Sequence, residues 1–246
     1  MIETTYSYNG AKTGSKFTAK VFAYMFLALV ITGVVAAVVG LIFSHYFPIN
    51  YGQPTNAGAS KAYIILLITS IVAYIPVMIW IQVKALKGNG SIIAPYTIYA
   101  VLMGILISSF TMFIPFYIIA LAFGLTSLSF GVMFLIGYFA KRDLSALAVI
   151  AFGMMTGLAI IGLFNLIWML VFPGTFQMFY WLITYGFFIV IVLLTIFDIQ
   201  NIKKLAMSGE TDKNVALMCS LNLYVDFIYI FIRLLILLVR VFGSNR

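Results

Sequence analysis

Two aspartates stand inside or beside segments that are apolar enough to enter a membrane. Asp226 lies in residues 220–233, Ser-Leu-Asn-Leu-Tyr-Val-Asp-Phe-Ile-Tyr-Ile-Phe-Ile-Arg, which also place Arg233 among apolar side chains. Asp198 ends the preceding apolar run, in Thr-Ile-Phe-Asp-Ile-Gln-Asn. A charge at mid-membrane costs between ~2.5 and more than ~10 kcal/mol depending on the reference state, so such residues face a polar interior and usually mark function.

The chemistry of this acid pair depends on whether the two carboxylates meet. Two like charges in a low dielectric cannot both ionise cheaply, so a pair within hydrogen-bond reach holds one proton and titrates in two separated steps. Such a pair is a pH-sensitive latch. Its unprotonated form is also an oxygen-ligand cluster for a hard cation such as Ca²⁺, so Asp198 and Asp226 are candidate proton-gating and metal-binding residues.

A simpler role for each aspartate stays open. Arg233 could neutralise Asp226, although it lies seven residues, or roughly 10.5 Å, further along the helix, beyond easy direct pairing. Asp198 could be no more than a polar helix end before a cytoplasmic loop. The separation of the two acids decides between these roles, and it depends on helix tilt.

Helical periodicity groups the polar residues around Asp226. Asn222, Asp226, Tyr229 and Arg233 follow one another at i, i+4, i+7 and i+11, so their side chains project from one face of a helix. We expect this face to look into the bundle, because polar groups avoid lipid. Asn222 and Arg233 are therefore candidate supporting residues for the acid pair.

Composition and charge identify the class of protein. The 246 residues are 64% hydrophobic and 8% charged, with a mean hydropathy of +1.16, which excludes an ordinary soluble surface. The apolar runs do not alternate, unlike the strands of a barrel. The formal charge of +8 comes from basic residues scattered among loops, which fits positive-inside placement better than binding to nucleic acid or anionic lipid. We expect an all-α polytopic membrane bundle without a cofactor.

Apolar runs of about 20 residues each predict seven membrane spans. The single Cys219 excludes an internal disulfide. Residues 1–20 are expected to form a cytoplasmic N-terminal arm, 21–239 the transmembrane domain and 240–246 a short C-terminal tail. The predicted spans are 21–43, 62–83, 96–113, 116–139, two within 144–197 that part at 172–175, and 215–238.

Basic residues and glycines add detail to this bundle. Ten lysines and arginines fall on one side of the spans and three (Lys61, Arg240 and Arg246) on the other, which predicts a cytoplasmic N-terminus and a C-terminus outside. Residues 44–61 are rich in turn formers and form the longest outer loop. The glycines of 124–137, and the small-xxx-small match of Gly153 and Gly157, predict close helix packing.

Three stretches resemble one protein family. Residues 220–228 are similar to the Asn-Leu-Tyr-aliphatic-Asp-Phe signature in the last helix of the Bax inhibitor-1 family, also called the transmembrane Bax inhibitor motif family. Residues 137–145, Gly-Tyr-Phe-Ala-Lys-Arg-Asp-Leu-Ser, are similar to the family's turn after the fourth helix. Residues 195–198 and the Ile-Lys pair beyond them are similar to its sixth-helix end. The resemblance covers about residues 17–238 and suggests a bacterial-type member.

The resemblance implies a seven-helix bundle with the last helix central and a pH-dependent calcium leak, in which Asp198 and Asp226 share a proton and regulate a pore around that helix. It also implies a part in ion homeostasis and stress or cell-death regulation, and a location in a bacterial inner membrane. In the family, an arginine of the second helix can latch one acid, but residues 62–83 contain none. Lys84 is the candidate substitute, although lysine cannot make the same planar bidentate contact.

Two other function classes stay open. A non-conducting regulator would bind another membrane protein, such as a membrane protease, through its lipid-facing surface. An intramembrane aspartyl protease would use two aspartates to activate water. Those enzymes carry Gly-x-Gly-Asp, whereas Leu-Tyr-Val precedes Asp226 here, so we expect no enzymatic activity.

Overall fold

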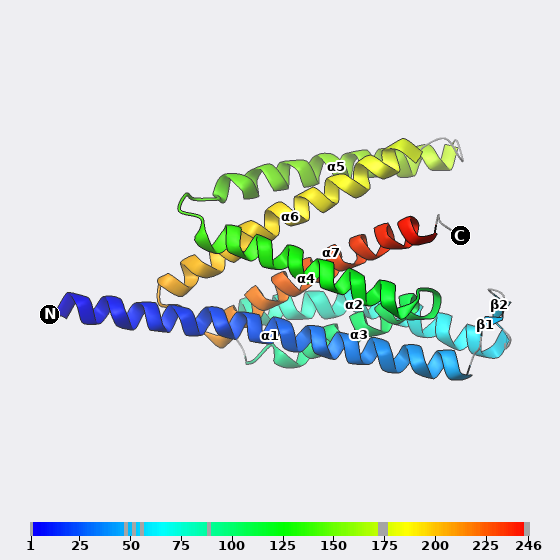
Figure 1. The fold of residues 1–246 in the computed structure, drawn as a ribbon, viewed down its shortest axis with the longest axis horizontal. Coiled ribbons are helices and arrows are strands. Elements are labelled where there is room, and N and C mark those ends of the chain that lie inside the picture. The colour runs from blue at the N-terminus through cyan, green and yellow to red at the C-terminus, as the bar shows by residue number, and fades with distance from the viewer. Residues whose placement is uncertain are drawn as a thin grey trace. The chain divides into compact units, whose positions relative to one another are not determined.

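The computed structural model describes residues 2–46, 49–50, 53–54, 57–87, 90–171 and 177–243. Within these ranges the chain forms seven helices and one short antiparallel strand pair (Figure 1). The elements are α1 (Ile2–Tyr46), β1 (Ile49–Asn50), β2 (Gln53–Pro54), α2 (Ala57–Lys87), α3 (Ile93–Phe113), α4 (Phe116–Phe139), α5 (Ser145–Val171), α6 (Gln177–Met207) and α7 (Lys213–Gly243). The predicted all-α fold is confirmed apart from β1 and β2, which lie in the predicted outer loop.

The helices coincide with the predicted spans. α4 has the predicted bounds, and α3 ends at Phe113 because Pro115 disfavours helical backbone at Ile114, which is extended at φ −113° and ψ 128°. Among the described residues, the six helices α1 to α6 are long and apolar enough to cross a membrane. α7 is not one of these six, so its crossing stays a prediction.

Several helices extend beyond their predicted spans. α6 continues to Met207, so Asp198 is not at its end, and α7 runs to Gly243, into the predicted C-terminal tail. α1 begins at Ile2, so the predicted N-terminal arm is helical and continuous with the first span. α2 begins at Ala57, inside the predicted outer loop of residues 44–61. A helix nucleated in an apolar run continues into polar flanks because each added residue gains a backbone hydrogen bond. The predicted break at 172–175 lies outside the described residues.

The chain divides into two compact units. Unit 1 comprises Met1–Leu121 and Gly209–Tyr224, and unit 2 comprises Ala122–Ser208 and Val225–Arg246. The long helix α7 therefore contributes its first half to unit 1 and its second half to unit 2. Asp198 and Asp226 both belong to unit 2.

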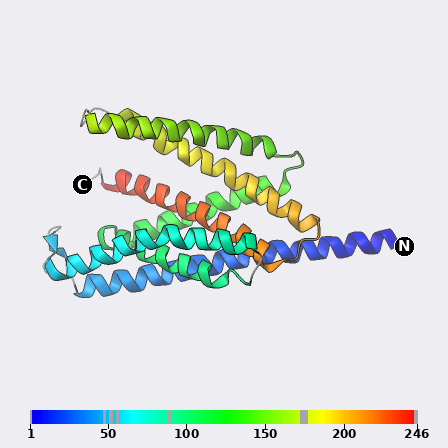
Figure 2. The ribbon, with the colours of Figure 1, turned by 180° about the vertical axis from the view of Figure 1, so that it is seen from behind.

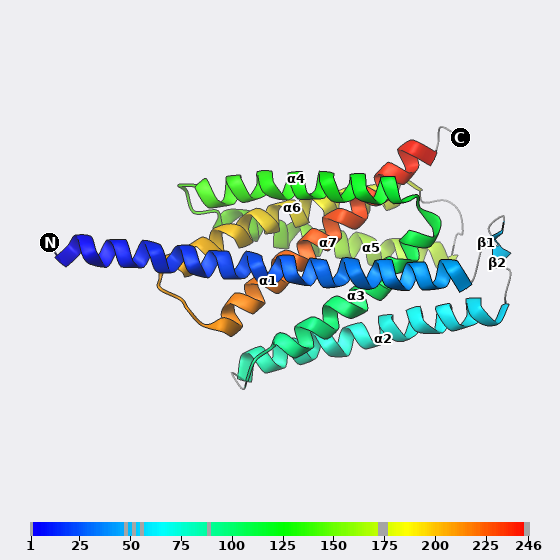
Figure 3. The same ribbon diagram turned by 60° about the horizontal axis from the view of Figure 1, so that its bottom comes forward.

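Unit 1 is organised around α3, which contacts both α1 and α2 (Figure 3). α1 and α3 approach closely at Gly104, where an added Cβ would lie 2.7 Å from the Cβ of Val35 and 2.8 Å from the carbonyl oxygen of Thr32. The Thr32 hydroxyl donates to the carbonyl of Ala100 at 3.0 Å. Small and hydroxylated residues thus bring these two helices together, as expected for packing in lipid.

Unit 2 contains most of α4, together with α5, α6 and the end of α7. α5 and α6 run side by side (Figures 1 and 2) around a core of Ala151, Leu158 and Val190. α4 packs on α7 through aromatic rings, with Phe123 and Phe130 each 5.6 Å from the ring of Phe227. These contacts give unit 2 an apolar interior of its own.

The glycine predictions for unit 2 are only partly confirmed. Gly137 of α4 meets α6 so closely that an added Cβ would lie 2.6 Å from the carbonyl oxygen of Ile196. Among the described residues of unit 2, a Cβ at Gly124, Gly131, Gly153 or Gly157 would meet no atom within 4 Å, so the prediction of close packing is wrong for these four within this unit. Glycine spacing alone does not say which face of a helix has a neighbour.

The turn between α4 and α5 is held by side chains of α6. The amide of Gln200, which is buried, donates to the carbonyl of Arg142 at 2.7 Å and accepts from the backbone N–H of Leu144 at 2.8 Å. Lys204 forms an ion pair with Asp143 at 2.6 Å. The turn lies within residues 137–145, the stretch that is similar to the family's turn after the fourth helix. Its backbone is fixed by side chains of α6.

The Lys204 ammonium also sets the protonation of Asp143. Its hydrogen bond, helped by the hydroxyl and N–H of Ser145, lowers the pKa of the Asp143 carboxyl from 3.8 to about 2. Because this pKa is lower in the folded protein than in the unfolded chain, the interaction stabilises the fold at any pH above the ordinary pKa of 3.8. The stabilisation is lost as the pH falls toward 2. Asp143 is therefore ionised throughout the neutral range.

The contact between Gly137 and α6 predicts a difference between two glycines of α4. Gly137→Ala should destabilise the protein by about 1–3 kcal/mol, because the new methyl group meets a backbone carbonyl that cannot move aside. Gly131→Ala is the control, because open space surrounds it, and it should be neutral or stabilise by up to about 1 kcal/mol. The measurement is reversible unfolding in micelles. Equal stability of the two variants would contradict the close α4–α6 packing.

Candidate functional site

The acid pair is supplied by α6 and α7 within unit 2. Asp198 lies nine residues before the end of α6, and Asp226 lies near the middle of α7. Both side chains are half-buried. Asp226 contacts α6 one turn before Asp198, so both acids lie in the same part of unit 2, and their sharing of a proton stays a prediction.

A threonine completes this site. The hydroxyl of Thr195 lies 3.0 Å from Oδ2 of Asp226 and 2.8 Å from the carbonyl oxygen of Ile191, one helical turn earlier. Thr195 is fully buried and stands three residues before Asp198, on the same helix. Asp226 therefore has a hydrogen-bond partner on α6 directly beside the second acid.

The single hydrogen of this hydroxyl makes the contact sensitive to protonation. An ionised carboxylate is a stronger acceptor than a carbonyl, so the Thr195 hydroxyl donates to Asp226 when Asp226 is charged. When Asp226 carries a proton, its carboxyl group can donate to Thr195, and the threonine hydrogen returns to the carbonyl of Ile191. The α6–α7 contact is thus retained in both states with the direction of donation reversed.

The site can supply only part of a metal shell. Within the described ranges, no three residues among histidine, cysteine, aspartate and glutamate come together. Ca²⁺ takes six to eight oxygen ligands, and two carboxylates provide at most four. A cation at Asp198 and Asp226 would therefore also need backbone carbonyls, Thr195 or water, and metal binding stays a prediction.

The predicted inward face of α7 is only partly correct. Asp226 and Arg233 are half-buried, but Asn222 is exposed and Tyr229 is 47% exposed. At about 100° per residue the four side chains share a stripe roughly 60° wide. The fully buried residues of α7 project from the other side of the helix, and they include Leu221, Leu223, Tyr224, Ile230 and Leu235. The stripe therefore lies roughly opposite the centre of the buried face, which aromatic and aliphatic residues occupy.

Arg233 and Lys84 lie in other surroundings. Arg233 lines a pocket whose lining includes neither acid. The ammonium of Lys84, in unit 1, lies 5.9 Å from the ring centroid of Trp80, one turn earlier on α2. This distance is within the range of a cation–π interaction. The role of Lys84 as a latch stays a prediction.

The tyrosine of the Asn-Leu-Tyr-Val-Asp motif has a structural role in unit 1. Tyr224 is fully buried, and its hydroxyl lies 2.7 Å from the hydroxyl of Thr32 on α1. Its ring packs edge to face with Tyr96 and Tyr99 of α3, at 6.0 Å in each case. Ser220, one turn earlier, shares a hydrogen bond of 2.9 Å with Tyr96. The motif therefore anchors α7 two residues before it presents Asp226.

Sequence reasoning missed Thr195 as a site residue. Threonines in membrane helices commonly bond back to the carbonyl four residues earlier, as Thr156 does as well, and a sequence gives no sign of a second partner. The position of Thr195, three residues before Asp198, is the one available signal, because i and i+3 share a helix face.

The fold and the site define a class, a polytopic helical membrane protein with an acid pair on its last two helices. A family profile described as "Inhibitor of apoptosis-promoting Bax1" matches residues 14–244. The chain therefore belongs to the Bax inhibitor-1 family, and the resemblance noted from its motifs is confirmed.

Similar proteins occur in several bacteria. The inner membrane protein YbhL of Escherichia coli (strain K12) is 28% identical over 242 residues, which cover 94% of this chain and 92% of YbhL. An uncharacterized protein of Borreliella burgdorferi is 28% identical over 262 residues, covering 100% of this chain and 99% of that protein. The membrane protein SpyM3_0260 of Streptococcus pyogenes is 30% identical over 172 residues, covering 69% and 71%.

The buried position of Tyr224 predicts a loss of stability when its hydroxyl is removed. Tyr224→Phe should lower the free energy of unfolding by about 0.6 to 1.7 kcal/mol, the range measured for hydrogen bonds between membrane helices. Tyr229→Phe on the same helix is the control and should change it by less than about 0.5 kcal/mol, because Tyr229 is exposed. Unfolding by a denaturing detergent measures both. A Tyr224→Phe protein as stable as its control would contradict the anchor.

Proposed function

We propose that this protein is a pH-sensitive cation leak of a bacterial inner membrane, with calcium as the transported ion and the Asp198–Asp226 pair as its gate. The observation that carries the proposal is the hydrogen bond between Thr195 and Asp226. It ties α6 to α7 beside a second acid, so a change of charge at the pair acts directly on the contact between two helices.

Proton sharing supplies the gating force. When both acids are ionised they repel each other in a medium of low dielectric, and one added proton removes that repulsion. The contact between α6 and α7 is then held by hydrogen bonds without an opposing charge. The protonation of the pair thereby favours one of two arrangements of these helices, which is the two-state element that a switch requires.

A passive path is sufficient for calcium. Moving a divalent ion across 100 mV releases roughly 4.6 kcal/mol, at ~2.3 kcal/mol per charge. No module that couples transport to another energy source is therefore needed. A regulated leak of this kind would contribute to ion homeostasis and to the stress response of the cell.

The proposed path runs around α7, with the N-terminus in the cytoplasm and the C-terminus outside. The excess of lysine and arginine on one side of the spans supports this orientation. A central position of α7 in the bundle is part of this proposal. Lys84, near the cytoplasmic end of α2, is the proposed replacement for the arginine that latches the acids in the family.

Removal of either acid tests the gate. Across about pH 6 to 8, a one-proton gate changes Ca²⁺ flux by up to about tenfold per pH unit. Asp226→Asn and Asp198→Asn should each reduce this change to less than about twofold, because one carboxylate has no partner with which to share a proton. The measurement is Ca²⁺ flux into liposomes that contain the purified protein alone.

Asp143→Asn is the matched control for the acid variants. Asp143 also belongs to unit 2, but its pKa of about 2 keeps it ionised across the assay range, so its variant should retain the wild-type pH profile. Wild-type profiles for Asp226→Asn and Asp198→Asn would rule out the acid-pair gate. If the wild-type protein carries no flux without an added partner, the regulator of another membrane protein becomes the better account.

The Thr195 hydroxyl predicts a shift of the same profile. Thr195→Val keeps the shape of the side chain but removes the donor to ionised Asp226, so the midpoint of the flux profile should move by about one pH unit toward higher pH. Thr195→Ser keeps a hydroxyl and should stay close to wild type. An unchanged midpoint in Thr195→Val would show that the hydrogen bond does not contribute to gating.

A further inference from the structure

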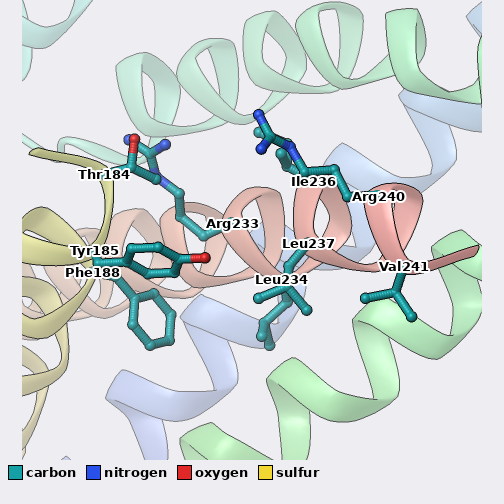
Figure 4. Close-up of a pocket in the computed structure, with 9 residues that line it drawn as sticks. All are labelled: Thr184, Tyr185, Phe188, Arg233, Leu234, Ile236, Leu237, Arg240 and Val241. Atoms are coloured by element: carbon teal, nitrogen blue, oxygen red, sulfur yellow. The ribbon is translucent and has the colours of Figure 1, made fainter. Parts of the chain in front are cut away.

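A pocket of about 460 Å³ lies between the first half of α6 and the second half of α7 (Figure 4). The lining of this α6–α7 pocket includes Thr184 and Phe188 of α6 and Arg233, Leu237 and Arg240 of α7. Because early residues of α6 meet late residues of α7, the two helices run in opposite directions here. The proposed leak has so far made no use of this pocket.

The pocket and the contact between Thr195 and Asp226 lie on the same faces of α6 and α7. Phe188 precedes Thr195 by seven residues on α6, and Arg233 follows Asp226 by seven residues on α7. Seven residues turn a helix through nearly two full turns and advance it by roughly 10.5 Å. Thr195 and Asp226 therefore project in almost the same directions as the two pocket residues, two turns deeper.

One turn of side chains separates the pocket from the acid contact. On α7 this turn supplies Tyr229 and Ile230, of which Ile230 is fully buried. On α6 it supplies Ile191 and Val192, which are both half-buried. An apolar layer about 5.4 Å thick stops hydrated ions, because these need a continuous wet path. A proton needs only an occasional water molecule beside Asp226.

The pocket extends toward the membrane surface that holds the C-terminus. Arg240 is three residues from the end of α7 at Gly243, and Thr184 is seven residues from the start of α6 at Gln177. Leu237 is exposed. Arginine side chains so close to a helix end reach the wet interface, so water from that surface has access to the pocket.

The charge of Arg233 indicates that water also reaches the end of the pocket next to the acid contact. Its side chain is half-buried, and no acid among the described residues of unit 2 forms an ion pair with it. An ionised group without a counter-ion at membrane depth faces a water-filled cavity. Arg240 and Tyr185, which also line the pocket, have partners within the chain. Arg233 is therefore the group whose hydration the pocket must supply.

Few charged groups surround Asp226 within unit 2. α6 contributes Asp198, and α7 contributes Tyr229 and Arg233, one and two turns further along. α4 and α5 carry no acidic or basic residue, and the tyrosines of α4 stand next to its two ends. The two lysines near the end of α6 bind the last turn of α4 and the turn that follows it. Between the pocket and Asp226, the described residues of unit 2 thus add no further charge.

We propose that the α6–α7 pocket is the route by which protons reach Asp226 from the side of the membrane that holds the C-terminus. A hydronium ion in the pocket passes its proton through water to the carboxylate, and a water molecule is left behind. Arg233 repels a divalent ion about twice as strongly as a hydronium ion, so calcium takes another path around α7. This inference rests on the proposed acid-pair gate and adds that the gate follows the pH outside the cell.

The reactivity of introduced cysteines tests the pocket without reference to transport. In the full-length Cys219→Ser protein, Leu237→Cys places a thiol in the pocket. Leu182→Cys is the control, because Leu182 is near the start of α6 and 53% exposed, against 43% for Leu237, but does not line the pocket. A charged thiol reagent that cannot cross membranes, added to intact cells, should modify Leu237→Cys about tenfold faster, because thiolates form in water. Equal rates, or modification of Leu237→Cys only in inside-out vesicles, would overturn the outer route.

The side on which pH acts tests the route itself. Ca²⁺ flux in right-side-out vesicles should follow the pH of the outer solution and not that of the inner one. After the reagent is attached to Leu237→Cys, the response to an outer pH jump should slow by about tenfold, with an unchanged midpoint, because a blocked pocket delays proton exchange without altering its equilibrium. Labelled Leu182→Cys should respond as before labelling.

The outcomes separate this inference from the proposed function. A pH-dependent flux that follows the inner pH, or a response of unchanged speed after Leu237→Cys is labelled, would overturn the outer route and leave the acid-pair gate standing. Absence of any flux would overturn the proposed leak instead. Unequal labelling of the two cysteine variants would in that case still show the pocket to be an outer water route.

Discussion

An ionisable carboxylate within a bundle of membrane helices must have a hydrogen-bonding partner, and this requirement organises unit 2. The partner of Asp226 is the hydroxyl of Thr195 on α6, which lies 3.0 Å from Oδ2 of Asp226. Asp198 also lies on α6, about one turn beyond Thr195. α4 supports this arrangement from its own contact with α6, where Gly137 allows the two backbones to approach. The α4–α5 turn is fixed to the same helix by Gln200. α6 is therefore the scaffold on which the acid site is built.

The regular geometry of an α-helix explains how the Asn-Leu-Tyr-Val-Asp motif of α7 can serve two purposes. Tyr224 and Asp226 are two residues apart, so they project from α7 in directions about 160° apart. Tyr224 is buried among aromatic and hydroxyl groups of unit 1. Asp226 belongs to unit 2 and accepts from the hydroxyl of Thr195 on α6. The same turn of helix thus combines a structural anchor with the candidate proton-sharing residue.

Much of the fold could be predicted from the sequence, because membrane helices coincide with apolar runs. The bounds of α4 and the turn at Pro115 followed directly from apolar length and proline chemistry. The helical arm at Ile2, the early start of α2 at Ala57 and the β1–β2 pair did not, because their polar residues carry no strong preference. Local hydrogen bonding continued these elements beyond what composition indicates.

The site was predictable in its acids and not in its surroundings. Periodicity placed Asn222, Asp226, Tyr229 and Arg233 on one face, but it could not say which neighbour covers that face, and Asn222 and Tyr229 are exposed. Thr195 gave no signal because its hydroxyl also has an ordinary partner on its own helix. Contacts between helices depend on tilt and rotation, which a sequence pattern does not contain.

The most direct measurement of the central claim is the titration of the two acids themselves. Infrared spectroscopy of the full-length protein in bilayers, with isotope-labelled aspartate, follows the carbonyl band of each protonated carboxyl group. The account predicts that the Asp198–Asp226 pair titrates in two separated steps. After removal of either acid, the remaining carboxyl group should titrate in a single step at an intermediate pH. Two independent titrations near the ordinary aspartate value of about 3.9, each unaffected by removal of the other acid, would contradict proton sharing.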